Sequence, residues 1–104
     1  MRKLLIIGAG GHARPVVATL RGLKEWNLVG IIDTNFREQS EGILGLPVLG
    51  SISVIKEFEP ASTDIFLAIG DNEQRKKLFL EPVLQGFDFP NLIHRLHHYH
   101  LYHI

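Results

Sequence analysis

The sequence predicts an α/β fold, a three-layer doubly wound parallel sheet of about five strands in the order 3-2-1-4-5. First, the apolar run Leu4–Ile7 ends in glycines and is followed directly by a helical pattern. Second, this arrangement is repeated, because the apolar run 64–69 also ends in a turn, Gly70–Asn72, that opens a helix. Third, both runs lack strict alternation, as expected of central strands that are covered on both faces. Two such units with right-handed connections would place both glycine turns at one crevice.

The first part of the chain is expected to supply the centre of the sheet. A strand is predicted over residues 3–7 and a helix over 12–23, in which Pro15 is tolerated in the first turn. A second strand is predicted over 28–32, and it ends at Asp33. Apolar residues at helical spacing are expected to place one face of the helix in the core, namely Val16, Val17, Leu20 and Leu23.

The middle of the chain is expected to complete one edge of the sheet. Residues 34–45 are polar without a clear period, so we expect a loop that borders the site. Residues 46–50 are predicted to form a short strand, which Pro47 favours at an edge because proline cannot donate to the ladder. A short helix is then predicted over 51–58, with Ser51 as its N-cap.

The second strand–turn–helix unit carries its own helix-start signals. Residues 64–69 are predicted to form a strand, and Asp71 or Asn72 can cap the helix that follows. Gln74 stands three residues after Asp71, as in a capping box. Pro82 predicts a kink or break just before it, and a last strand is expected over about 89–93.

The last eleven residues differ in composition from the rest. Five of the six histidines lie in this stretch. Because terminal segments without packing partners stay mobile, we expect a domain over residues 1–94 and a poorly ordered tail over 95–104. Imidazoles could coordinate zinc or nickel here, but we assign no metal site to His97, His100 and His103.

The first glycine turn has the pattern Gly-x-Gly-x-x-Ala. Gly8 would permit the tight turn, Gly10 would let a pyrophosphate approach the backbone, and Ala13 would let the helix pack closely against the strand. Backbone N–H groups at the start of such a helix suit an anionic ligand, most simply a diphosphate. Asp33 follows about 20 residues later, where dinucleotide folds place an acid that binds ribose hydroxyls. A glycine-rich turn that binds no ligand is the alternative.

The charge balance, the lengths of the apolar runs and the absence of cysteine argue against several kinds of partner and site. The 104 residues include 11 acidic and 11 basic side chains, so no charge excess indicates nucleic acid or an anionic membrane. No run approaches the ~18 apolar residues of a membrane span, and we expect a cytoplasmic protein. The absence of cysteine excludes disulfides, thiolate metal sites and a cysteine nucleophile.

Three motifs in this order resemble a known family. They are Gly8–Ala13, Ala68–Leu78 and Asn91–His94. Over residues 1–94 the chain resembles the N-terminal domain of the bacterial nucleotide-sugar acetyltransferases of polysaccharide and glycan biosynthesis. These include the UDP-4-amino-sugar and GDP-perosamine N-acetyltransferases and the sialic acid O-acetyltransferase-like proteins. In that family a Rossmann-like N-terminal domain binds the nucleotide sugar, and a C-terminal left-handed β-helix binds acetyl-CoA and supplies the catalytic histidine.

The resemblance implies roles for particular residues. The first turn would lie near the phosphates, with Gly8, Gly10, Gly11 and His12. Asp33 would face the base or ribose, although Thr34 stands where family members often carry a second acid. The opposite wall, near the sugar, would consist of Gly70, Asp71 and Asn72.

The resemblance also implies what this chain would not do alone. His94 is followed by Arg95 rather than by the family's proline, and no β-helix follows. We therefore expect a domain that binds a UDP- or GDP-linked amino sugar, with no catalytic residue or cofactor of its own, because acetyl-CoA would bind the missing domain. Whether the chain is an enzyme stays open, and the family's trimer is not expected without the β-helix. The alternatives are an NAD-binding oxidoreductase module and an assembly module without a small-molecule ligand.

Overall fold

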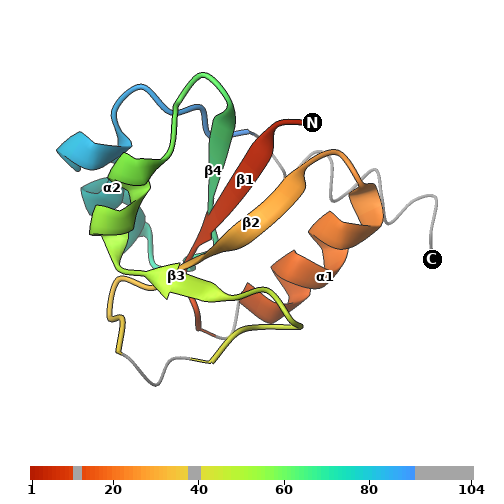
Figure 1. The fold of residues 1–104 in the computed structure, drawn as a ribbon. Coiled ribbons are helices and arrows are strands. Elements are labelled where there is room, and N and C mark those ends of the chain that lie inside the picture. Colours follow the sequence, from red (N-terminus) through yellow and green to blue (C-terminus); the bar gives the residue numbers. More distant parts are fainter. Residues whose placement is uncertain (11–12, 38–40, 91–104) are drawn as a thin grey trace.

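Four parallel strands form the sheet, in the order β3-β2-β1-β4 (Figure 1). The computed structural model describes residues 1–10, 13–37 and 41–90. The central pair is β1, Lys3–Ile7, and β2, Asn27–Ile32. The edges are β3, Val48–Gly50, and β4, Thr63–Leu67. The predicted order of these strands is confirmed, and Pro47 precedes an edge strand as expected.

A fifth strand is not shown. Beside β4 the described residues contain one isolated parallel bridge, between Asp64 and Asp88, and Ile65 donates its N–H to the Asp88 carbonyl over 3.0 Å. Residues 91–93 of the predicted last strand, and the tail to residue 104, lie outside the described part of the chain. The prediction of five strands is thus confirmed only for the first four.

Two α-helices and two 3₁₀ helices connect the strands. The α-helices are α1, Ala13–Leu23, and α2, Asn72–Phe79. Residues 52–57 form a 3₁₀ helix, η1. Ser51 occupies its N-cap position as predicted, but the serine side chain makes no capping hydrogen bond. A second 3₁₀ helix, η2, covers Pro82–Leu84, which confirms the predicted break at this proline. In the described part of the chain, no helix has the length and apolar character needed to span a membrane.

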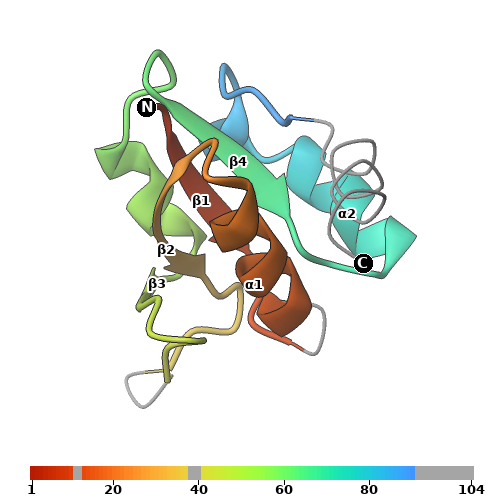
Figure 2. The ribbon, with the colours of Figure 1, turned by 90° about the vertical axis from the view of Figure 1, so that its right-hand side faces the viewer.

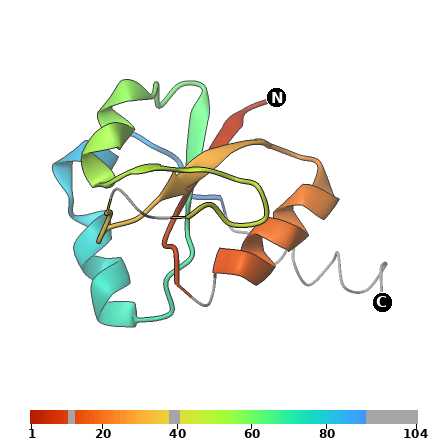
Figure 3. The same ribbon diagram turned by 60° about the horizontal axis from the view of Figure 1, so that its bottom comes forward.

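Helices cover both faces of the sheet, which gives the predicted three layers (Figure 1, Figure 3). Alternate residues of β1 enter different cores because successive strand side chains point to opposite faces. On one face Leu4 and Ile6 pack with Val17 and Leu20 of α1. On the other face β1 packs with η1, α2 and η2, through Leu5, Ile7, Ile55, Leu78 and Leu84. Each fully buried leucine or isoleucine contributes roughly 1.5–3 kcal/mol.

The predicted loop before β3 contains a tight turn. Ile43 and Leu46 exchange two backbone hydrogen bonds of 2.9 Å, and the two residues between them have positive φ, 51° at Leu44 and 82° at Gly45. Positive φ at both central positions is typical of a two-residue type I′ turn. Arg21 of α1 donates to the Leu44 carbonyl, which holds this turn against the helix.

A polar cluster ties together the amino ends of three strands. Asp64 of β4 accepts hydrogen bonds from Arg2, which precedes β1, and from Trp26, which precedes β2. Arg2 also donates to the backbone carbonyls of Pro60 and Ala61, in the turn before β4. This cluster lies at the end of the sheet opposite to the glycine turns.

Candidate functional site

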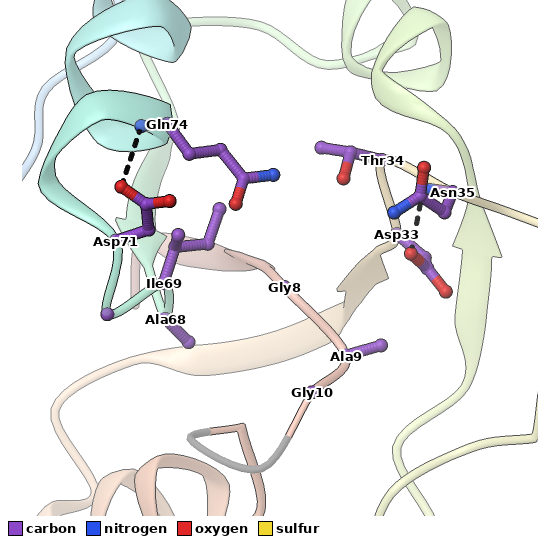
Figure 4. A pocket seen from close by; sticks show the side chains of 11 residues that line it. Gly8, Ala9, Gly10, Asp33, Thr34, Asn35, Ala68, Ile69, Asp71 and Gln74 are labelled. Carbon is purple, nitrogen blue, oxygen red and sulfur yellow. Dashed lines mark hydrogen bonds between the residues drawn. The ribbon is translucent and has the colours of Figure 1, made fainter.

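A cleft of about 500 Å³ opens at the carboxyl ends of β1, β2 and β4 (Figure 4). Its walls come from the three segments that follow these strands. The lining residues are Gly8, Ala9, Gly10, Asp33, Thr34, Asn35, Ala68, Ile69, Gly70, Asp71 and Gln74. In doubly wound sheets ligands bind at this place, where the strand order reverses.

Backbone hydrogen bonds join the starts of these three segments at the carboxyl end of the sheet. The N–H of Gly8 donates to the Ile32 carbonyl over 2.8 Å, and the N–H of Ala68 donates to the Ile7 carbonyl over 2.8 Å. Beyond β2, the N–H of Asp33 donates to the Gly50 carbonyl over 3.0 Å. Past these last ladder bonds the segments diverge, and the cleft lies between them (Figure 4).

The two described glycines of the first turn serve different purposes. Gly8 has φ +121°, and a Cβ there would lie 2.6 Å from the Ala68 carbonyl oxygen, so the fold itself requires glycine. A Cβ at Gly10 would meet no atom within 4 Å. Packing therefore gives no reason for glycine at position 10, and its missing side chain leaves the cleft wall open to a ligand.

Asp33 holds the segment after β2 in place and keeps one carboxylate oxygen available to accept a hydrogen bond. Its Oδ1 accepts the N–H of Asn35 over 2.9 Å, and its carbonyl accepts the N–H of Phe36 over 3.0 Å. This Asx-type turn holds the segment after β2 in place. Oδ2 of this half-buried carboxylate accepts no hydrogen bond from the described residues, so it can accept one from a ligand hydroxyl.

Asp71 is the N-cap of α2, which decides between the two predicted caps. Its carboxylate accepts the N–H groups of Glu73 over 2.9 Å and Gln74 over 3.4 Å. Those two amides of the helix start are therefore already bonded and do not face a ligand. The Gln74 side chain extends into the cleft toward the segment that contains Thr34 (Figure 4).

The structure brings together most of the predicted site residues. Gly8, Gly10, Asp33, Gly70 and Asp71 all line the cleft. Asn72 does not line it and is the first residue of α2. Gly11 and His12 lie outside the described residues. The binding roles of all these residues stay predictions.

Sequence reasoning missed several lining residues, of which Gln74 carries the most chemistry. It was singled out only for helix capping, yet it follows the N-cap Asp71 by three residues, a spacing that places two side chains on the same side of a helix start. The other lining residues were not predicted individually but lie within two positions of predicted ones, and residues 34 and 35 belong to the loop predicted to border the site; they are Ala9, Thr34, Asn35, Ala68 and Ile69.

The lining chemistry suits hydroxyl-rich ligands. Two carboxylates, Asp33 and Asp71, and the amides of Asn35 and Gln74 supply hydrogen-bonding groups, and no basic side chain lines the cleft among the described residues. The described ranges also contain no group of three or more histidine, cysteine or acidic residues that could hold a metal ion.

Comparisons with known proteins place the chain in a family. Residues 3–81 match the family described as the PglD N-terminal domain. No curated protein gives a significant match to the chain. The acetyltransferase domain of PglB from Neisseria gonorrhoeae FA1090, solved in complex with acetyl coenzyme A, is 31% identical, with a TM-score of 0.66. The match covers 83% of this chain and 40% of that chain.

A second solved relative has a sugar nucleotide bound. A mutant of perosamine N-acetyltransferase from Caulobacter crescentus, in complex with CoA and GDP-perosamine, is 32% identical with a TM-score of 0.65. The match covers 82% of this chain and 39% of that chain, so this chain spans about 40% of the length of these solved acetyltransferases. The family match includes both turns of the cleft and most of the chain. The chain therefore belongs to the PglD N-terminal domain family of sugar acetyltransferases.

Proposed function

We propose that this domain binds the nucleotide part of a UDP- or GDP-linked amino sugar in the cleft between the two glycine turns. The observation that carries this proposal is the open wall at Gly10, opposite an Asp33 carboxylate that keeps a free acceptor oxygen. A glycine that is not needed for packing lets a diphosphate approach the backbone closely. A carboxylate nearby can bind the hydroxyl groups of the ribose. The relative solved with GDP-perosamine supports the same ligand class.

The arrangement of the walls suggests an orientation for the ligand. The nucleoside would lie against Asp33, Thr34 and Asn35, whose carboxylate, hydroxyl and amide can bond the ribose and base. The diphosphate would cross the backbone of the first turn at Gly10. The sugar would then lie toward Asp71 and Gln74, which offer acceptors for its hydroxyl groups.

In this proposal the domain selects and holds the sugar nucleotide but does not transfer acetyl. Acetyl transfer needs a general base beside the sugar amine or hydroxyl and a bound acetyl thioester. The described cleft offers only the capping carboxylate Asp71 near the sugar, and its oxygen already accepts two backbone N–H groups. We therefore propose that acetyl-CoA and the catalytic base belong to a part of the enzyme beyond the matched residues.

Ligand-dependent thermal denaturation tests this function. UDP-sugars, GDP-sugars, the free nucleotides and NAD are added separately, and a ligand at 100 times its Kd should add about 2.7 kcal/mol of stability. Stabilisation by a sugar nucleotide and not by NAD supports the proposal. Stabilisation by NAD alone would instead favour an oxidoreductase module, and no stabilisation by any of them would favour an assembly module.

A variant pair tests the position of the ligand. Gly10→Val adds a side chain to the open wall and should abolish nucleotide binding while the thermal midpoint without ligand stays close to that of the wild type. Ala18→Val, an exposed position of α1, is the matched control and should bind normally. Unchanged affinity in Gly10→Val would show that the ligand lies elsewhere.

A further inference from the structure

A smaller groove of about 200 Å³ adjoins the cleft on the other side of the segment that links β4 to α2. The two cavities share Ala68, Ile69 and Gly70 as a common wall. Figure 2 shows β4 running between α1 and α2, and residues of all three elements line the groove. Its remaining lining residues are Val16, Phe66, Leu67 and Arg75.

Arg75 is the charged residue of this groove. Its side chain is half-buried, and it forms no ion pair or side-chain hydrogen bond with the described residues. Its neighbour Lys76 differs, because that ammonium is exposed and lies 3.9 Å from the Glu73 carboxylate. A guanidinium without a counter-charge that is partly withdrawn from water by apolar walls favours the binding of an anion.

The acidic lining of the main cleft does not by itself favour a diphosphate. Among the described residues its lining contains the carboxylates Asp33 and Asp71 and no basic side chain. The amides of Glu73 and Gln74 at the start of α2 are taken by Asp71, so they cannot compensate a phosphate. Apart from the backbone N–H groups at the start of α1, a diphosphate at Gly10 would gain positive charge only from outside this described lining, and Arg75 lies just across the shared wall.

We propose that Arg75 binds the distal phosphate of the diphosphate ligand by reaching over Gly70, so that the attached sugar stays beside Asp71 and Gln74 in the cleft. This inference rests on the proposed function, because it assumes a nucleotide in the cleft. Gly70 has no side chain to obstruct the crossing, and a planar guanidinium can donate two parallel hydrogen bonds to one phosphate. The consequence is selectivity: Arg75 contributes to the binding of nucleoside diphosphates and not to that of monophosphates.

Calorimetric titration of the full 104-residue chain tests this selectivity with UDP and UMP, and then with GDP and GMP. Arg75→Gln should weaken diphosphate binding by about tenfold or more and leave monophosphate binding unchanged. The matched control is Lys77→Gln, an exposed charge two residues further along α2, which should change neither affinity. Equal losses for diphosphate and monophosphate, or no loss in Arg75→Gln, would overturn the inference.

The two proposals can fail separately. If the wild type binds UDP or GDP and Arg75→Gln binds it equally well, the groove subsite is wrong and the proposed function stands. If the wild type binds no nucleotide, the proposed function is wrong. A titration with inorganic pyrophosphate then tests whether Arg75 binds phosphate. A shift of the Arg75 Nε–H resonance with pyrophosphate that is absent with chloride at equal ionic strength supports the subsite. No shift overturns it.

Discussion

Trp26 donates its indole N–H to the Asp64 carboxylate over 3.0 Å, although 38 positions separate the two residues in the chain. Arg2 donates to the other carboxylate oxygen, with its Nη2 at 2.7 Å and its Nε at 3.0 Å. Burial raises the pKa of the Asp64 carboxyl, but the hydrogen bonds from Arg2 and Trp26 and the charge of Arg2 outweigh it. The pKa of Asp64 therefore lies below its usual value, and the carboxylate is the stable form in the folded protein.

This lowered pKa predicts how stability depends on pH. Because the folded-state pKa of Asp64 is below the unfolded value of about 3.9, its contribution is present above that value and is lost as pH falls through the folded-state pKa. Asp64→Asn should lower the free energy of unfolding at pH 7 by about 1–2 kcal/mol and flatten its fall in acid. Urea denaturation between pH 2 and pH 7 measures both effects. Glu57→Gln, which changes an exposed acid, is the control. The prediction would be contradicted if the free energy of unfolding fell equally steeply in acid for Asp64→Asn and for Glu57→Gln.

The two described glycines of the first turn should respond differently to alanine. Gly8→Ala forces a Cβ against the Ala68 carbonyl at a positive φ, so it should lower stability by roughly 2–3 kcal/mol or prevent folding. Gly10→Ala meets no atom within 4 Å and should change stability by less than about 0.5 kcal/mol. Circular dichroism melts of the two variants measure the contrast. Similar melting temperatures would contradict the steric argument.

Asp71 should stabilise α2 independently of any ligand. Asp71→Ala removes the acceptor for the N–H groups of Glu73 and Gln74, and we expect a loss of about 1 kcal/mol. Asp71→Ser keeps a capping oxygen and should recover most of that loss. Denaturation without ligand measures this, and an Ala variant as stable as the Ser variant would show that the cap contributes little.

Asp33→Asn should separate ligand binding from folding. The amide oxygen of Asn can still accept the N–H of Asn35, so the turn after β2 should persist with near wild-type stability. The charged acceptor for a ribose hydroxyl is lost, and we expect nucleotide affinity to fall roughly tenfold. Calorimetric titration with UDP and GDP measures the affinity, and a matching thermal midpoint establishes that the fold is intact. Unchanged affinity would place the ribose away from Asp33.

Thr63 offers a route to a more stable domain. Its side chain is fully buried, and its Oγ1 has no hydrogen-bond partner among the described residues. Thr63→Val replaces this hydroxyl with a methyl group of similar shape and should raise the free energy of unfolding by about 1 kcal/mol. Urea denaturation measures the gain. A loss of stability would show that the hydroxyl is hydrated or bonded in solution.

The sequence predicted the strand–turn–helix units well because their signals are local. An apolar run, a glycine turn and helical spacing are contiguous at Leu4–Leu23 and again at 64–79, and the topological rule for doubly wound sheets then places the cleft. The features that it missed depend on tertiary contacts. The Trp26–Asp64 hydrogen bond joins distant segments, and the direction of the Gln74 side chain depends on how α2 docks.

The 3₁₀ geometry of residues 52–57 was missed for a related reason. Ile52, Ile55 and Phe58 recur at a spacing of three, which fits both an α-helical face and a 3₁₀ turn. Single-sequence periodicity does not separate these geometries over six residues. In the 3₁₀ geometry Ile55 is buried in the core, where it packs with Ile32 of β2 and Ile65 of β4.

The anchoring cluster of Arg2, Trp26 and Asp64 lies at the amino ends of the strands, and the cleft lies at their carboxyl ends. Under the proposed function, ligand preference can change through substitutions in the segments that line the cleft, while the Arg2–Trp26–Asp64 cluster at the other end of the sheet holds the strands together. Substitutions in the segments that line the cleft, made to test the proposed sugar-nucleotide binding, should therefore leave the fold stable as long as that cluster is kept, except at Gly8, where the fold itself requires glycine.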